Sequence, residues 1–295
     1  MRNPMNLEEL DDLLDDHPHD RKDNAIIVKA PFGYHGSKTR SIPNLLKYLP
    51  YMDVWVDVFG GSGVVTLNRE PSKKLDVYND RWSGVTTFFR CMRDPVKLDL
   101  MINQLSLMPH SKEEFYDSKD WYKGTSDVDR AVKWYYMLQT SYAHVGRNWG
   151  YSRFSAINNK AAENLEHFPH IAKRFMEVQI DNEDFRTIFE RYDSPRTVFY
   201  CDPPYVDAHV AGAYIHAFNE NDDQDLMDCI FNAKGYVALS NYGNNFHKKQ
   251  PWDDVFLWDL RNQQHGAQTE TNHRIGADTV QNRTEYLYIK EVSDS

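Results

Sequence analysis

Short apolar runs, each bounded by glycine or polar residues, recur in the first and last parts of the chain. Runs of this kind predict buried strands. The expected strands cover residues 54–59, 75–79, 178–180, 197–200, 236–240, 255–260 and 285–289, with a strand or extended entry at 25–29. We expect the last two strands, 255–260 and 285–289, to pair antiparallel.

The run at 54–59 leads into Gly60-Gly61-Ser62-Gly63, followed by a helix at 64–68 and the strand at 75–79. This order of strand, glycine loop, helix and strand predicts an α/β fold built on a parallel sheet. Further helices are expected at 185–191, at 226–231 and at 41–49, where Ser41 can cap the helix and Pro43 is tolerated in the first turn.

The pattern becomes mostly helical between residues 84 and 174. Helices are expected at 85–92, 95–105, 112–118, 128–142 and 161–174, with a polar and aromatic loop at 143–153. We therefore predict one α/β domain made of residues 25–84 and 175–295. A helical insertion, 85–174, interrupts this domain, and an acidic leader, 1–24, precedes it.

The composition is that of a protein with a full core, without a membrane helix or a disulfide framework. No apolar run approaches the ~20 residues that a membrane helix needs, and the start of the chain lacks a signal-peptide pattern. Three cysteines, Cys91, Cys201 and Cys229, have no metal-ligand spacing. They are interpreted as reduced thiols in a cytoplasmic protein.

The net charge of −10 argues against a polyanionic partner, but it is unevenly distributed. Residues 8–23 carry eight acids against two bases, whereas residues 88–180 carry 13 bases against 11 acids. Because phosphate contacts need locally basic side chains, the insertion can still contact nucleic acid.

Cys201-Asp202-Pro203-Pro204-Tyr205 follows the run at 197–200 and has the chemistry of an amine-binding pocket. Each proline fixes its φ angle and lacks a backbone donor, which leaves nearby carbonyls free to accept. Asp202 and a proline-flanked carbonyl can hold one amino group while Tyr205 stacks on its ring, as suits a nucleobase amine. An ordinary strand-ending turn is the alternative.

Two further acids lie at or just beyond the ends of strands that are expected to be neighbours. Asp57 precedes the glycine loop, where a nucleotide-like ligand binds in open α/β sheets, and can hold a cationic amino group. Asp80 lies near the spacing of about 20 residues at which an acid holds ribose hydroxyls. A tight turn and a solvated loop acid are the respective alternatives.

Taken in order, these segments resemble the Dam-type (D12 class, group α) DNA adenine-N6 methyltransferases, most closely bacteriophage and prophage members. The resemblance extends from about residue 31 to 292. The segments are Tyr34-His35-Gly36-Ser37-Lys38, Asp57 to Gly63, Asp80, Asp184-Phe185, Asp202 to Tyr205 and the closing strand Arg283-Thr284-Glu285-Tyr286-Leu287-Tyr288-Ile289. The resemblance implies a Rossmann-like catalytic domain and a target-recognition insertion at 85–174. It also implies a function in restriction–modification.

The resemblance also implies the chemistry, namely direct methyl transfer from S-adenosylmethionine to a flipped adenine in duplex DNA. The catalytic residues would be Asp202, Pro203, Pro204 and Tyr205. The cofactor-binding residues would be Tyr34, Lys38, Asp57, Phe59, Gly61, Gly63, Asp80, Asp184, Phe185 and Asp202. Within that set, Asp57 would lie near the cofactor amino group, Asp80 at the ribose hydroxyls, and Asp184 and Phe185 at the adenine ring.

The loop at 143–153 resembles the family's DNA-contacting hairpin. The resemblance also places Lys38 near the target strand. Arg147, Asn148 and Arg153 are candidate DNA contacts, because arginine can bind guanine and asparagine adenine through paired hydrogen bonds. Trp149 and Tyr151 can wedge or stack between bases. A solvated loop pinned by two core aromatics is the alternative.

This sequence departs from the family at Asp57, more often glutamate, and at Ser37, more often glycine. Both departures affect cofactor affinity more than reaction type. Two other functions remain open, an RNA or protein-amide methyltransferase and a catalytically silent DNA-binding or anti-restriction protein. The histidines show no metal spacing, and we expect His209, His216 and His247 at the surface. Ser240 can help to shape the pocket or end a strand.

Overall fold

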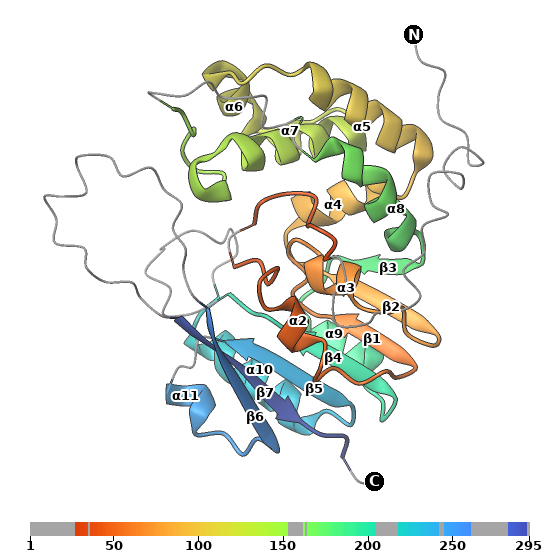
Figure 1. Cartoon of the computed structure of the whole chain (residues 1–295), viewed down its shortest axis with the longest axis vertical. Helices are drawn as coiled ribbons and strands as arrows, with labels where there is room; N and C mark the ends of the chain where they lie inside the picture. The colour runs from red at the N-terminus through yellow and green to blue at the C-terminus, as the bar shows by residue number, and fades with distance from the viewer. Residues whose placement is uncertain are drawn as a thin grey trace, which may run out of the picture.

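The structure is a computed structural model, and it describes residues 27–34, 36–152, 162, 164–204, 218–241, 245–260 and 283–293. In these residues seven strands form one sheet in the order β3-β2-β1-β4-β5-β7-β6 (Figure 1). The strands are β1 (Val54–Asp57), β2 (Leu75–Asn79), β3 (Val178–Asp181), β4 (Thr197–Cys201), β5 (Tyr236–Asn241), β6 (Asp254–Leu260) and β7 (Arg283–Lys290). Strands β1 to β5 run parallel, and β7 runs antiparallel to β5 and β6. The predicted Rossmann-like α/β class is confirmed.

Alternate residues of the central strands enter two separate cores, because successive side chains of a strand point to opposite faces. Phe199 of β4 packs with helices α9 (Phe185–Tyr192) and α10 (Glu220–Asn232). Its neighbours Val198 and Tyr200 pack on the other face with α2 (Ile42–Leu45) and α3 (Val64–Asn68). The sheet therefore lies between two helical layers.

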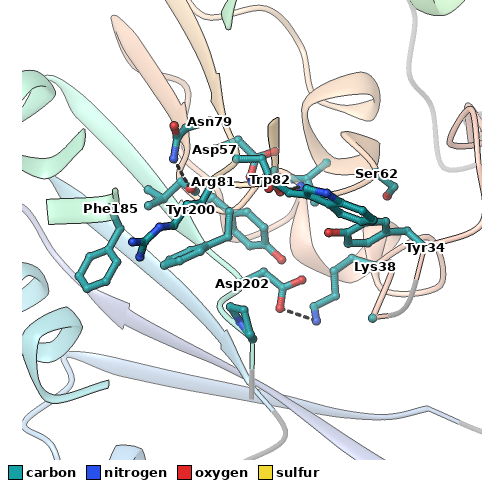
Figure 2. A pocket seen from close by; sticks show the side chains of 18 of the residues that line it. Tyr34, Lys38, Asp57, Ser62, Asn79, Arg81, Trp82, Phe185, Tyr200 and Asp202 are labelled. Atoms are coloured by element: carbon teal, nitrogen blue, oxygen red, sulfur yellow. Dashed lines mark hydrogen bonds and ion pairs between the residues drawn. The ribbon is translucent and has the colours of Figure 1, made fainter. Parts of the chain in front are cut away.

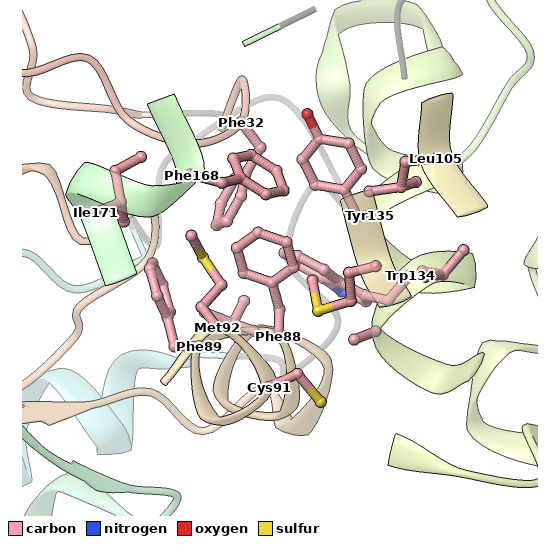
Figure 3. Close-up of a cluster of buried hydrophobic side chains, with 14 of the residues drawn as sticks. Phe32, Phe88, Phe89, Cys91, Met92, Leu105, Trp134, Tyr135, Phe168 and Ile171 are labelled. Carbon is pink, nitrogen blue, oxygen red and sulfur yellow. The ribbon is translucent and has the colours of Figure 1, made fainter. Parts of the chain in front are cut away.

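The remaining long helices form a separate layer beside the β3 edge of the sheet (Figure 1). They are α4 (Ser83–Met92), α5 (Pro95–Leu107), α6 (Lys112–Ser118), α7 (Asp127–Thr140) and α8 (Phe168–Met176), with 3₁₀ turns at Trp121–Lys123, Tyr142–His144 and Leu165–His167. Aromatic side chains fill their core, as Figure 3 shows around Phe88, which stacks on Tyr135 with ring centroids 5.4 Å apart. The predicted domain limits at 84/85 and 174/175 fall inside α4 and α8.

Several predicted elements differ in length from those observed. The helix expected at 41–49 spans only Ile42–Leu45, and the Ser41 hydroxyl accepts a hydrogen bond from the Trp258 indole instead of capping it. The helix expected at 161–174 begins at Phe168, where Pro169 occupies its first turn. Helix α11 (Asn245–Lys248) was not predicted. The leader at 1–24 lies outside the described residues.

The strand order reverses at β1, whose two neighbours are β2 and β4. The helices that follow β1 and β4 cover opposite faces, so the loops after these strands separate and leave a crevice. Among the described residues, no helix is long and apolar enough to cross a membrane.

Candidate active site

A cleft opens at the carboxyl ends of β1, β2 and β4, where the strand order reverses (Figure 2). Its empty volume is about 1050 Å³, open solvent at its mouth included. Residues from the segment before α2, from the ends of β1, β2 and β4, and from the start of α9 line it.

The glycine loop after β1 forms the floor of the cleft. Gly61 has a φ of 49°, and its N–H donates to Oδ2 of Asp80 at 2.9 Å. The Tyr78 hydroxyl donates to the Gly61 carbonyl at 2.6 Å, and a Cβ on Gly60 would lie 2.1 Å from the Tyr78 ring. Only glycine fits at residue 60, because a side chain there would overlap the buried Tyr78 ring.

Asp57 lies at the end of β1 and is almost fully buried, with 1% of its surface exposed. Burial, together with the charges of Asp202 and Asp80, raises the pKa of its carboxyl to about 7, although the Thr66 hydrogen bond lowers it. Its ionised form suits a cationic ligand group.

Asp80 and Asn79 hold the β2 end of the cleft together. Burial raises the pKa of Asp80 to about 6, although its carboxylate accepts hydrogen bonds from the N–H groups of Trp82 and Gly61. The Asn79 amide donates to the Val58 carbonyl at 2.9 Å, and its oxygen accepts from the Glu183 N–H. The loops that follow β1, β2 and β3 are thus fixed relative to one another.

Asp202 follows β4 and faces the cleft beside Lys38 (Figure 2). Nζ of Lys38 lies 2.7 Å from Oδ1 of Asp202 and 3.2 Å from Oε1 of Glu285 on β7. The hydroxyl of Ser240 on β5 donates to the same Glu285 oxygen at 2.5 Å. Lys38 thereby connects the segment before α2 with the ends of β4 and β7.

Aromatic side chains line the walls of the cleft. Tyr34 lies beside Trp82 with ring centroids 6.4 Å apart, and Phe59 lies 5.8 Å from Phe185. Flat apolar walls beside buried carboxylates suit a ligand that joins aromatic rings to cationic groups.

Residues 34–261 match the family described as D12 class N6 adenine-specific DNA methyltransferase. The chain belongs to this family. The description of that family names N6 of adenine in DNA as the site of methylation. In the described residues no group of histidine, cysteine, aspartate or glutamate side chains is arranged to hold a metal ion.

This D12-class chain is also similar to the "Modification methylase LlaI" of Lactococcus lactis subsp. lactis. The two are 28% identical over 196 residues, which is 63% of this chain and 31% of that protein. The match thus spans about a third of the relative's length. That relative is bacterial, so the expected similarity to bacteriophage members stays a prediction.

The structure brings most of the predicted site residues to one cleft. The residues that line it are Tyr34, Lys38, Asp57, Phe59, Gly61, Asp80, Phe185, Asp202 and Pro204. Gly63 lies behind the loop instead, where a Cβ would be 2.9 Å from the Phe175 ring. Pro203 is buried next to Asp202. Tyr205 lies outside the described residues.

Asp184 is not among the residues that line the cleft. Its carboxylate caps α9 by accepting from the Arg186 N–H, and it pairs with the guanidinium groups of Arg81 and Arg186 at 3.0 and 2.9 Å. Glu183 and Phe185 on either side of it do line the cleft. Of the predicted pair Asp184 and Phe185, Phe185 is therefore the one that lines the cleft.

The predicted DNA-contacting residues occupy two different environments. Arg147 and Asn148 are exposed on the loop after α7, whose backbone is held by the hydrogen bond from Tyr142 N to Asn148 O at 2.7 Å. A Cβ on Gly33 would lie 2.5 Å from the His144 ring, so this loop packs against the segment that carries Tyr34. Lys38 is buried at the cleft, and Arg153 lies outside the described residues.

Sequence reasoning missed two roles. Glu285 was placed only in the closing strand, although an acid within an otherwise apolar strand is a signal for a buried ion pair. The expectation that His247 lies at the surface is wrong. It is 1% exposed and lies between Asp223 at 2.8 Å and the Asn241 amide at 2.9 Å. His209 and His216 lie outside the described residues.

Proposed function

We propose that this chain transfers a methyl group from S-adenosylmethionine to the N6 amino group of adenine in double-stranded DNA. The observation that carries the proposal is the meeting of Asp202 with Asp57 and the glycine loop in one cleft. One cleft thus offers both an amine acceptor and a glycine loop flanked by buried acids. The family match supports DNA adenine as the substrate class.

The residues of the cleft fit S-adenosylmethionine, which supplies an electrophilic methyl group when bound. Ionised Asp57 would accept from its amino group, and the missing side chain at Gly61, where a Cβ would lie 2.9 Å from the Tyr34 ring, leaves room for its methionine part. Each Asp80 oxygen accepts one backbone N–H and retains a lone pair for ribose hydroxyls. Phe59 and Phe185 would contact the adenine ring.

Asp202 and Pro203 would prepare the target amine. The N6 lone pair is delocalised into the purine ring, which makes the free amine a poor nucleophile. Hydrogen bonds from N6 to the Asp202 carboxylate and the Pro203 carbonyl favour a tetrahedral nitrogen and direct its lone pair at the methyl group. Orientation of this kind accounts for much of the acceleration in such reactions.

The target base has to leave the duplex, because N6 is paired and stacked there. Extrusion costs a few kcal/mol, and stacking on an aromatic side chain recovers about 1–3 kcal/mol per base. We assign that stacking to Tyr205. Arg147 and Asn148, exposed on a loop that packs beside the Tyr34 segment, would contact the DNA around the extruded base.

Expression in bacteria that lack DNA methyltransferases, followed by sequencing of the genome for modified bases, tests this function. The expected result is N6-methyladenine within one short recognition sequence, absent from cells that express Asp202→Ala. Asp228→Asn, an exposed acid on α10, is the matched control and should methylate like the wild type. An unmodified genome with soluble wild-type protein would contradict the proposal.

A further inference from the structure

Glu285 is a buried acid in the middle of β7. It is 0% exposed, and its Oε1 lies near two donors, the Ser240 hydroxyl and the Lys38 ammonium. Among the described residues its other oxygen, Oε2, has no hydrogen-bond partner. Because a buried carboxylate without a partner is strongly unfavourable, the contact with the Lys38 ammonium stabilises Glu285 in the core.

Lys38 therefore serves two carboxylates at once. Its side chain is 4% exposed, and the ammonium lies 2.7 Å from Asp202 and 3.2 Å from Glu285. An ammonium has three N–H donors, so both contacts can form together. The two partners differ in access, because the Asp202 side chain is 17% exposed towards the cleft and Glu285 is enclosed.

The contact between Lys38 and Asp202 affects the role proposed for Asp202. Its Oδ1 accepts the ammonium, so an incoming amine would share the carboxylate with a cation that weakens it as an acceptor. If the Lys38 ammonium left Asp202 and gained no other acceptor, its nearly buried positive charge would lack that partner. Such a charge costs far more than a contact in water.

We propose that Glu285 is a positioning residue that takes over the Lys38 ammonium when the adenine amino group reaches Asp202. The inference rests on the proposed function and deepens it. Oε2 of Glu285 supplies an additional acceptor for the N–H group that Asp202 gives up. The ammonium thus stays paired throughout, and Asp202 becomes available to orient N6.

A purely structural role predicts different behaviour. If Glu285 only anchored β7, its replacement would lower stability and would slow methyl transfer by the same factor whether or not Lys38 were present. If it acts through Lys38, its effect on the rate should disappear when the ammonium is removed. A double-mutant cycle separates the two roles.

The test uses purified full-length protein, labelled S-adenosylmethionine and unmethylated bacterial genomic DNA in single-turnover assays. Glu285→Gln keeps the shape and removes the charge, and Glu291→Gln, an exposed acid just beyond the same strand, is the matched control. We expect Glu285→Gln to slow methyl transfer about 10- to 100-fold, as small misplacements of reacting groups do. The Kd for S-adenosylmethionine should change less than about threefold, because uniform binding is not lost.

In the Lys38→Met background, Glu285→Gln should cause no further loss of rate. An equal loss in both backgrounds, or a wild-type rate for Glu285→Gln, would overturn the inference while leaving the proposed function intact. A wild type and Glu291→Gln that both fail to methylate would instead contradict the proposed function. If Glu285→Gln does not fold, Glu285→Asp replaces it in the same comparison. Its side chain is one methylene shorter, which moves the carboxylate away from Lys38.

Discussion

The Thr66 hydroxyl donates a hydrogen bond to Oδ2 of Asp57 at 2.8 Å, inside a site that water barely reaches. One hydrogen bond does not offset burial, and the pKa of Asp57 rises from 3.8 to about 7. The cleft therefore contains a carboxyl whose pKa lies near neutral pH. Two predictions concern this group.

The affinity for S-adenosylmethionine should increase as the pH rises through about 7. The ionised form of Asp57 would bind the cofactor amino group, so binding lowers the pKa of Asp57 and releases a proton. Calorimetry at pH 6, 7 and 8 in buffers of different ionisation enthalpy measures both effects. Asp57→Asn should bind more weakly and lose the pH dependence. A wild-type affinity that does not vary with pH would count against Asp57 at the amino group.

The stability of the unliganded protein should show the opposite trend. Because the folded-state pKa of Asp57 is raised, its stabilising contribution is complete below 3.8 and is lost as the pH rises through about 7. A difference of this size corresponds to an effect on the order of 4 kcal/mol. The free energy of unfolding should fall from pH 5 to pH 7 in the wild type, level off above pH 7, and fall less in Asp57→Asn. Parallel curves for the two proteins would contradict the burial argument.

Arg147→Ala should weaken binding to duplex DNA and reduce the slope of log K against log salt by about 1. Arg147 is exposed on the loop after α7, which packs beside the Tyr34 segment. Arg196→Ala is the matched control, because Arg196 is 71% exposed and lies just before β4, at the end of that strand away from the cleft. Fluorescence anisotropy at several salt concentrations measures both variants. Equal DNA affinities for Arg147→Ala and Arg196→Ala would show that the loop after α7 does not contact DNA.

His247→Ala should lower the free energy of unfolding by about 3 kcal/mol, because it leaves the buried side chains of Asp223 and Asn241 without a partner. His167→Ala is the control. Its ring is 44% exposed, and the change should stay within about 0.5 kcal/mol. Urea denaturation of both variants gives the comparison. A loss for His247→Ala no larger than for His167→Ala would show that the buried network contributes little.

Local sequence patterns predicted the elements whose ends are set by neighbouring residues in the chain. The limits of β2 and α3 are as expected, since polar residues and the glycine loop bound each of them. Strand ends could also be assigned to the cleft, because parallel strands present their carboxyl ends at one edge. Helix ends in the insertion were less accurate, as tertiary packing determines where such helices stop.

The ion pairs of the site could not be predicted in this way. Burial of Lys38 is tolerable only because Asp202 and Glu285 reach it from distant strands, and no local pattern encodes such contacts. The same holds for His247, whose partners lie on α10 and β5. A charged residue in an apolar strand signals that a partner exists without identifying it.

The most direct test of the central claim follows the methyl group itself. Purified protein is incubated with S-adenosylmethionine carrying a deuterated methyl group, together with unmethylated DNA, and the DNA is digested to nucleosides for mass spectrometry. The account predicts deuterium-labelled N6-methyldeoxyadenosine with the wild type and none with Asp202→Ala. Label in cytosine, in added RNA or in protein, with unlabelled adenine, would contradict it.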